Sequence, residues 1–102
     1  MAELTIVYWR DIPAQVIARA GRKTAKVELP KRFMEAIDAA AMRAGATDSD
    51  AYLAEWRRGD PAKCDEDLDA AVAAAAQALV LTYDGDRLRE LIASGGRDMP
   101  SP

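Results

Sequence analysis

The chain contains no histidine and only one cysteine, Cys64. Without histidine it lacks the commonest general base at neutral pH and the commonest metal ligand. A single cysteine forms no disulfide within the chain and no thiolate cluster for zinc. These absences exclude Ser-His-Asp, Cys-His and thiolate-zinc chemistry within one chain. We therefore expect a non-catalytic protein with no metal site and no cofactor.

Long apolar segments are also missing. The most apolar run, residues 70–81, is too short and too rich in alanine to span a bilayer. The first five residues show no basic start followed by an apolar segment, as a secretion signal would. We therefore expect a cytoplasmic protein without membrane contact. A length of 102 residues favours a single domain, over residues 1–95, followed by a disordered tail, residues 96–102.

Large apolar side chains are fewer than the composition suggests, because alanine supplies 22 of the 51 hydrophobic residues. The spacing of the other 29 predicts strands over residues 4–9, 15–20 and 24–29. Residues 21–23 would join the last two strands as a three-residue hairpin loop. This loop pairs Ala20 with Thr24, and one face of the hairpin then gathers the apolar side chains of Ile17, Val27 and Leu29.

The second half of the chain has the pattern of helices. Pro30 and Gly45 bracket a helix to about residue 44. Caps within residues 47–50 begin a short helix that stops before Gly59, Asp65 begins a longer one that ends near residue 83, and a last helix covers residues 87–94. The sequence therefore predicts an α+β domain, in which a small antiparallel sheet of about three strands is followed by three to four helices packed on one of its faces.

The end of the first strand, Tyr8-Trp9-Arg10-Asp11, combines residue types that are frequent in protein interfaces. Side chains alternate along a strand, so Tyr8 and Trp9 face opposite sides of the sheet. One of them belongs to the core, and the other lies under a second layer or meets a partner. The alternative interpretation is that one aromatic residue packs under the first helix while Arg10 and Asp11 form a surface ion pair.

A second segment, Trp56-Arg57-Arg58, repeats the pattern of an aromatic residue followed by arginine. If it meets the first strand, Arg10, Arg57 and Arg58 could bind a small anion. Otherwise the arginines lie at the end of a helix, where its dipole favours cations. The candidate interaction surface comprises Tyr8, Trp9, Arg10, Asp11, Trp56, Arg57 and Arg58.

Charge is unevenly distributed along the chain. Residues 1–34 hold seven Lys and Arg against three Asp and Glu, a net charge of +4, whereas residues 35–102 carry −7. Six cations form a candidate basic patch around the hairpin and the start of the first helix: Arg19, Arg22, Lys23, Lys26, Lys31 and Arg32. They would bind nucleic acid, or they would only keep a sheet edge from aggregating. The overall charge of −3 argues against nucleic acid.

Three segments resemble a small bacterial family whose members are described only as virulence factors: residues 4–16, residues 43–52 and Glu55–Asp60. The resemblance spans about residues 3–95, and a similar domain is fused within conserved virulence factor C of staphylococci. The family implies no catalytic residue or cofactor. Fusion to a larger protein suits an interaction module, and stand-alone relatives lie beside folate- and corrinoid-dependent one-carbon genes.

Three functions follow as hypotheses. The first is a non-catalytic module that docks on a protein partner, such as an enzyme subunit, or on a second copy of the chain. The second is a domain that binds a small anion, a nucleotide or a folate, in one-carbon metabolism. The third is nucleic-acid binding through the basic hairpin.

Overall fold

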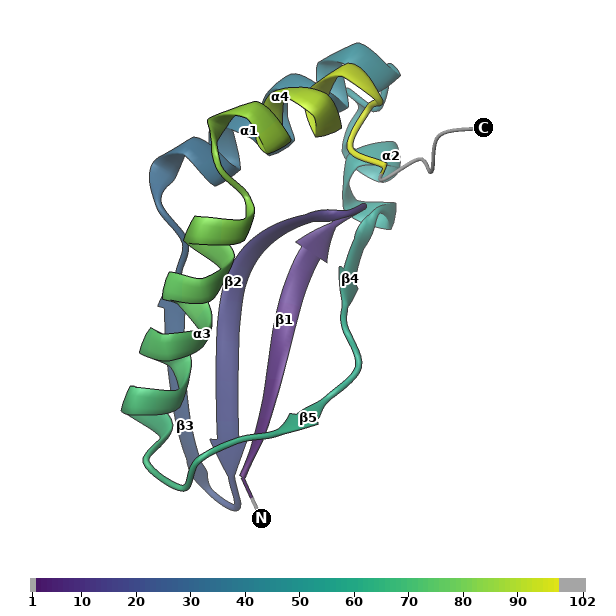
Figure 1. Cartoon of the computed structure of the whole chain (residues 1–102). Helices are drawn as coiled ribbons and strands as arrows, with labels where there is room; N and C mark the ends of the chain where they lie inside the picture. The colour runs from purple at the N-terminus through teal and green to yellow at the C-terminus, as the bar shows by residue number, and fades with distance from the viewer. Residues whose placement is uncertain (1, 98–102) are drawn as a thin grey trace.

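The computed structural model describes residues 2–97 and has an α+β fold (Figure 1). Five strands form one antiparallel sheet, in the order β3-β2-β1-β4, with β5 pairing with β1 beyond the end of β4. The strands are β1 (Glu3–Trp9), β2 (Ile12–Ala20), β3 (Lys23–Glu28), β4 (Trp56–Arg58) and β5 (Ala62–Lys63). The helices are α1 (Lys31–Ala44), α2 (Ser49–Ala54), α3 (Leu68–Thr82) and α4 (Gly85–Ala93).

The first hairpin differs from the sequence-based expectation. Strand β2 begins at Ile12, directly after a two-residue turn, and Trp9 lies opposite Ile12. Arg10 in this turn has a φ of 53°, in the left-handed region that non-glycine residues seldom adopt. Pro13 is accommodated because the register shifts here and leaves Ala14 as a bulge. Pro13 therefore lies within the strand, which begins three residues before the predicted start at residue 15.

The second hairpin has a different register from the predicted one. Its loop has two residues, with Ala20 opposite Lys23, and Gly21 has a φ of 60° at the first central position, as a type II′ turn requires. The shift of one residue reverses the faces. Val16 and Ala18 are buried against the helices, and Ile17 lies on the opposite face beside Lys26. The expected core face through Ile17 was therefore wrong.

The segment predicted as the end of the second helix is a strand. Helix α2 stops at Ala54, and β4 follows it, antiparallel to β1. Trp56 lies opposite Trp9, and Arg57 lies opposite Tyr8. The sheet therefore has five strands, against the three expected. The two aromatic-arginine segments do meet, as neighbours in the sheet.

Helix boundaries agree closely with the predicted caps. Gly45, with a φ of 76°, ends α1 in the left-handed conformation. The Asp48 and Asp84 carboxylates accept hydrogen bonds from backbone N–H groups in the first turns of α2 and α4. Asp67, and not the expected Asp65, plays this part for α3.

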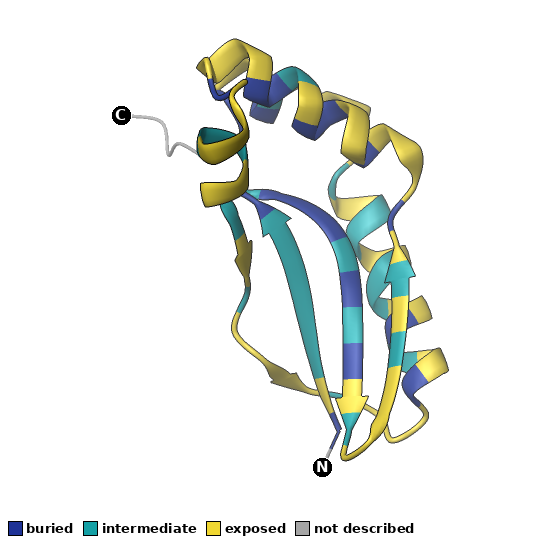
Figure 2. Ribbon diagram, turned by 180° about the vertical axis from the view of Figure 1, so that it is seen from behind, coloured by how far each residue is buried: buried dark blue, intermediate teal, exposed yellow. Residues whose placement is uncertain are grey.

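The helices leave much of one face of the sheet uncovered. α3 packs on β2 and β3, while α1 and α4 pack together across the end of the sheet (Figure 1). Val16 and Ala18 of β2 are buried beneath α3, and among residues 2–97 no helix covers the other side of the sheet, apart from α2 at the Trp9 end of β1 (Figure 2). We call this side the open face. Its strand residues are Glu3, Thr5, Val7, Gln15, Ile17, Arg19, Thr24, Lys26, Glu28, Arg58 and Lys63.

The expected tail begins later than predicted. Gly96 is buried, its N–H donates to Leu91 O, and its carbonyl accepts a 2.8 Å bond from Asp11 N. Residues 96 and 97 are therefore part of the fold, because they close over the β1–β2 turn. The rest of the predicted tail, residues 98–102, lies outside the described residues.

Candidate functional site

Trp9 belongs to the core. Its side chain is 0% exposed, its indole N–H donates to Tyr52 O at 2.9 Å, and its ring stacks on that of Tyr52 with centroids 5.8 Å apart. Gly96 lies directly against the six-membered ring of the indole, at its Cζ3 and Cε3 atoms. Trp9 is enclosed by α2 and by residues 95–97, which we call the C-terminal segment. It therefore cannot contact a partner and does not belong to an interaction surface.

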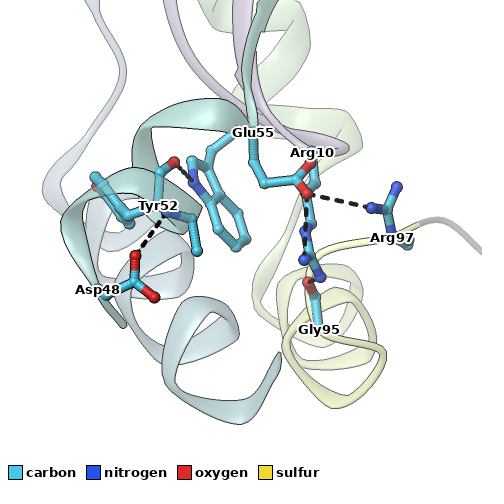
Figure 3. A network of polar contacts seen from close by, with 8 residues as sticks. Arg10, Asp48, Tyr52, Glu55, Gly95 and Arg97 are labelled. Atoms are coloured by element: carbon cyan, nitrogen blue, oxygen red, sulfur yellow. Dashed lines mark hydrogen bonds and ion pairs between the residues drawn. The ribbon is translucent and has the colours of Figure 1, made fainter. Parts of the chain in front are cut away.

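Arg10 joins the segments that enclose Trp9. Its guanidinium lies 5.0 Å from the centre of the Trp9 ring and donates to Gly95 O at 2.9 Å. Glu55 accepts from both Arg10 and Arg97, each at 3.4 Å (Figure 3). Arg10 Nε is buried and makes no hydrogen bond within the described residues. The side chain is thus occupied in joining the β1–β2 turn, the end of α2 and the C-terminal segment.

Tyr8, Asp11 and Arg57 form a second cluster on the α3 side of the sheet. The Arg57 guanidinium lies 4.5 Å from the centre of the Tyr8 ring. It bonds to the Asp11 carboxylate at 2.9 Å and, through Nε, to Arg10 O at 2.8 Å. An exposed pair of this kind contributes little stability, but it neutralises the arginine.

The anion site of three arginines does not assemble. Arg10 and Arg57 are brought close by strand pairing, but each faces a carboxylate of this chain. Arg58 projects from the opposite face of β4 to Arg57, because neighbouring side chains on a strand alternate. A bound anion would have to displace Glu55 and Asp11 and would still be out of reach of Arg58.

Trp56 differs from Trp9 in being half-buried. Its ring meets the Tyr52 ring edge-on, with centroids 6.0 Å apart. It lines a hollow of about 270 Å³, together with Ala14, Gln15, Glu28, Leu29 and Met34. Gln15 and Glu28 are open-face residues, so Trp56 presents apolar surface at the α1 end of this face.

The six residues of the basic patch do not form one surface. Arg22 lies in the β2–β3 turn, whereas Lys31 begins α1 at the other end of β3 (Figure 1). Arg32 turns away to Val80 O and lies over the Phe33 ring, at 5.2 Å from its centre. Of the others, Arg19 and Lys26 belong to the open face, and Lys23 lies beside the acidic start of α3.

A hollow on the open face unites one residue from each predicted set. It has a volume of about 340 Å³ and is lined by Glu3, Thr5, Ile17, Arg19, Arg58, Gly59 and Pro61. Arg19 comes from β2, and Arg58 comes from β4, on the other side of β1. Neither guanidinium makes a hydrogen bond or an ion pair with residues 2–97. We call this the Arg19–Arg58 hollow.

Sequence reasoning missed the Arg19–Arg58 hollow because it placed Arg58 at a helix end. Once the register is known, alternation along each strand does place these side chains on one face: Thr5 on β1, and Ile17 and Arg19 on β2. The register itself depends on the bulge at Ala14 and the two-residue turn, which the hydrophobic pattern alone does not determine.

Tyr52 is a described group whose titration is clearly shifted. Burial raises the pKa of its phenol, and the negative charge of Asp38 raises it further. The phenol therefore stays neutral beyond the pH at which tyrosine ordinarily ionises. This suits a ring that stacks on Trp9 and supports the core.

Other classes of site have little basis in residues 2–97. No group of three Cys, Asp or Glu side chains there could hold a metal ion. No helix of the described chain has the length and apolar character needed to cross a membrane. Asp65 and Asp67 have local structural roles before α3: the Asp67 carboxylate caps the helix by accepting from Ala70 N, and the Asp65 carboxylate accepts from Asp67 N in the preceding loop.

Comparison with known proteins gives one relationship. A family model described as "Virulence factor" matches residues 7–92. The chain belongs to the virulence factor family. No curated protein and no solved structure matches the chain. The match begins inside β1 and ends inside α4, so it includes β2 to β5 and the end of β1 but not the open-face residues Glu3 and Thr5.

Proposed function

We propose that this member of the virulence factor family is a non-catalytic, cytoplasmic protein-interaction module whose contact surface is the open face of the sheet. The observation that carries the proposal is that Val7, Ile17 and Trp56 lie half-buried on this side, where no helix within residues 2–97 covers β2 and β3. A sheet face that meets only water usually carries polar side chains, and these three apolar side chains interrupt an otherwise polar face.

The composition of the face favours a protein partner. Trp56 and Arg58 are of the residue types that contribute most to interface energies. Burial of apolar surface provides about 25 cal/mol per Å², so covering Ile17 and Val7 would contribute favourably to binding. The surrounding cations would form the polar rim that interfaces usually have.

The other two functions have less support. Small-anion binding loses Arg10 and Arg57 to Glu55 and Asp11. Nucleic-acid binding requires a continuous cationic track with stacking platforms, whereas the six cations are divided between both ends of β3 and both faces of the sheet.

The proposal can be tested by affinity capture from the native host with paired variants. Ile17→Asp places a charge on the open face, and Leu81→Asp places the same charge on the outer side of α3, where Leu81 is 74% exposed. Circular dichroism establishes that both variants are folded. We expect proteins captured by the wild type to be retained by Leu81→Asp and lost with Ile17→Asp.

The contrary result is equally clear. If Ile17→Asp captures the same proteins as the wild type, the open face is not the contact surface. If neither the wild type nor Leu81→Asp captures any protein reproducibly, the proposed module has no partner under native conditions.

A further inference from the structure

We infer that the Arg19–Arg58 hollow receives a carboxylate side chain of an acidic amphipathic helix in the partner. This inference rests on the proposed function, because it takes the open face as the contact surface. Its basis is a pair of arginines, from strands on either side of β1, that both line one hollow and make no hydrogen bond or ion pair with residues 2–97.

The charge of the hollow selects the ligand. Its lining holds Arg19, Arg58 and Glu3, which sum to +1. One carboxylate brings the site to neutrality, whereas a phosphate dianion would leave it negative beside Glu3. Hydrogen bonds from guanidinium to carboxylate are charge-assisted and frequently bidentate, and Thr5 adds a hydroxyl to the lining.

The wider face is complementary to an acidic partner. The open face carries Arg19, Lys26, Arg58 and Lys63 against Glu3 and Glu28, a net charge of +2. The chain as a whole carries −3. An acidic partner is therefore repelled by the rest of the molecule and attracted here, which orients the encounter.

A second hollow on the same face defines the spacing of the contacts. The hollow beside Trp56 and Met34 includes Gln15 of β2, and the Arg19–Arg58 hollow includes Ile17 and Arg19. Their centres are separated along β2 by roughly three residues, or about 10 Å. Residues i and i+7 of a helix lie on one side at a similar spacing, of about 10.5 Å.

A helix suits this surface better than a strand does. An extended peptide is bound through the unpaired backbone groups of a sheet edge, whereas a sheet face is covered by another layer. The partner helix would thus place an Asp or Glu between the two arginines and a large apolar residue two turns away, against Trp56.

The test uses the full chain and a synthetic helical peptide of roughly 15 residues that carries a glutamate seven positions before a leucine. Binding is measured by fluorescence anisotropy of the labelled peptide and mapped by backbone amide NMR shifts. We expect shifts in β1, β2 and β4. Arg19→Gln or Arg58→Gln should each weaken binding about tenfold or more, as expected for lost charge-assisted bonds. Arg22→Gln, which removes the same charge in the turn, should change it less than twofold.

Three results with the peptide would overturn the inference. The first is equal binding of a peptide with glutamine in place of glutamate. The second is equal weakening by Arg22→Gln, which indicates attraction to net charge alone. The third is the absence of binding to the wild type. Inorganic phosphate is titrated in parallel, and if it produces the same shifts at equal concentration, the hollow is a free-anion site.

A further capture experiment distinguishes failure of the carboxylate assignment from failure of the proposed function. Partner capture is repeated with the double variant Arg19→Gln/Arg58→Gln. If this variant still captures proteins that Ile17→Asp loses, the open face is the contact surface, but the carboxylate assignment is wrong. If Ile17→Asp loses nothing, the proposed function itself fails.

Discussion

Substitution of Trp9 tests whether this residue supports the fold or meets a partner. The indole is 0% exposed, so Trp9→Ala removes a large buried side chain and leaves a cavity, at a cost of about 3–5 kcal/mol. It also removes the bond to Tyr52 O, which contributes about 1 kcal/mol. A domain of this size has a free energy of unfolding of about 5–15 kcal/mol. We expect Trp9→Ala to be largely unfolded or close to it.

Trp9→Phe gives a graded measurement in the same site. It keeps an aromatic ring against Tyr52 but loses the indole N–H and part of the ring volume. Tyr52 O still accepts from Glu55 N at 3.4 Å, so its carbonyl keeps one partner. We expect a loss of about 1.5–3 kcal/mol, from one hydrogen bond and a partial cavity.

The assay is urea unfolding followed by far-ultraviolet circular dichroism, with the slope of free energy against urea as a check on the denatured state. Trp56→Phe is the matched control, because Trp56 is only half-buried and makes an edge-on contact. It should cost less than about 1 kcal/mol. A loss below about 1 kcal/mol for Trp9→Ala, or a greater loss for Trp56→Phe than for Trp9→Phe, would refute the assignment of Trp9 to the core.

Three further predictions concern the surroundings of Trp9. Gly96→Ala should destabilise by about 1–3 kcal/mol in urea unfolding, because Gly96 has a φ of 91° and an added Cβ would lie 2.9 Å from the Trp9 ring; an unchanged midpoint would contradict the close contact. Arg57→Ala should cost less than about 1 kcal/mol, and less still in high salt, because its pair with Asp11 is exposed; a larger, salt-independent loss would contradict this. The raised pKa of Tyr52 means that ionisation favours the unfolded chain. Stability from this group is complete below about pH 10 and is lost as the pH rises toward the folded pKa, so Tyr52→Phe should lose less stability than the wild type between pH 9 and 11; parallel curves would contradict it.

Helices were predictable from this sequence because their signals are local. Gly45, Asp48 and Asp84 act through their own backbone or through N–H groups in the following turn, so their role can be read without knowledge of the rest of the fold. The alternation that separates Tyr8 from Trp9 is local in the same sense. These features placed the helices within a few residues and put the two aromatic side chains on opposite faces.

The strands required information that is not local. β4 has three residues, too few to show a period, and it exists because Trp56 and Arg57 pair with the distant strand β1. The hairpin register depends on whether one or two residues follow Gly21, and both choices leave apolar pairs on some face. Propensity cannot decide between them, and only the tertiary packing shows that Val16 and Ala18 lie beneath α3 while Ile17 lies on the open face.

The register also explains how two similar segments acquire different roles. Trp9 and Trp56 are paired across β1 and β4, but only Trp9 lies where the C-terminal segment closes over the sheet. Arg10 binds that segment through Gly95 O. Arg58, two residues beyond Trp56, lies on the open face and has no hydrogen-bond or ion-pair partner among residues 2–97. The two similar segments are therefore paired in the sheet, where Trp9 belongs to the core and Trp56 lies beside it at the surface. In the proposed interface these two segments contribute Trp56 and Arg58, because Trp9 and Arg10 are already engaged in the fold.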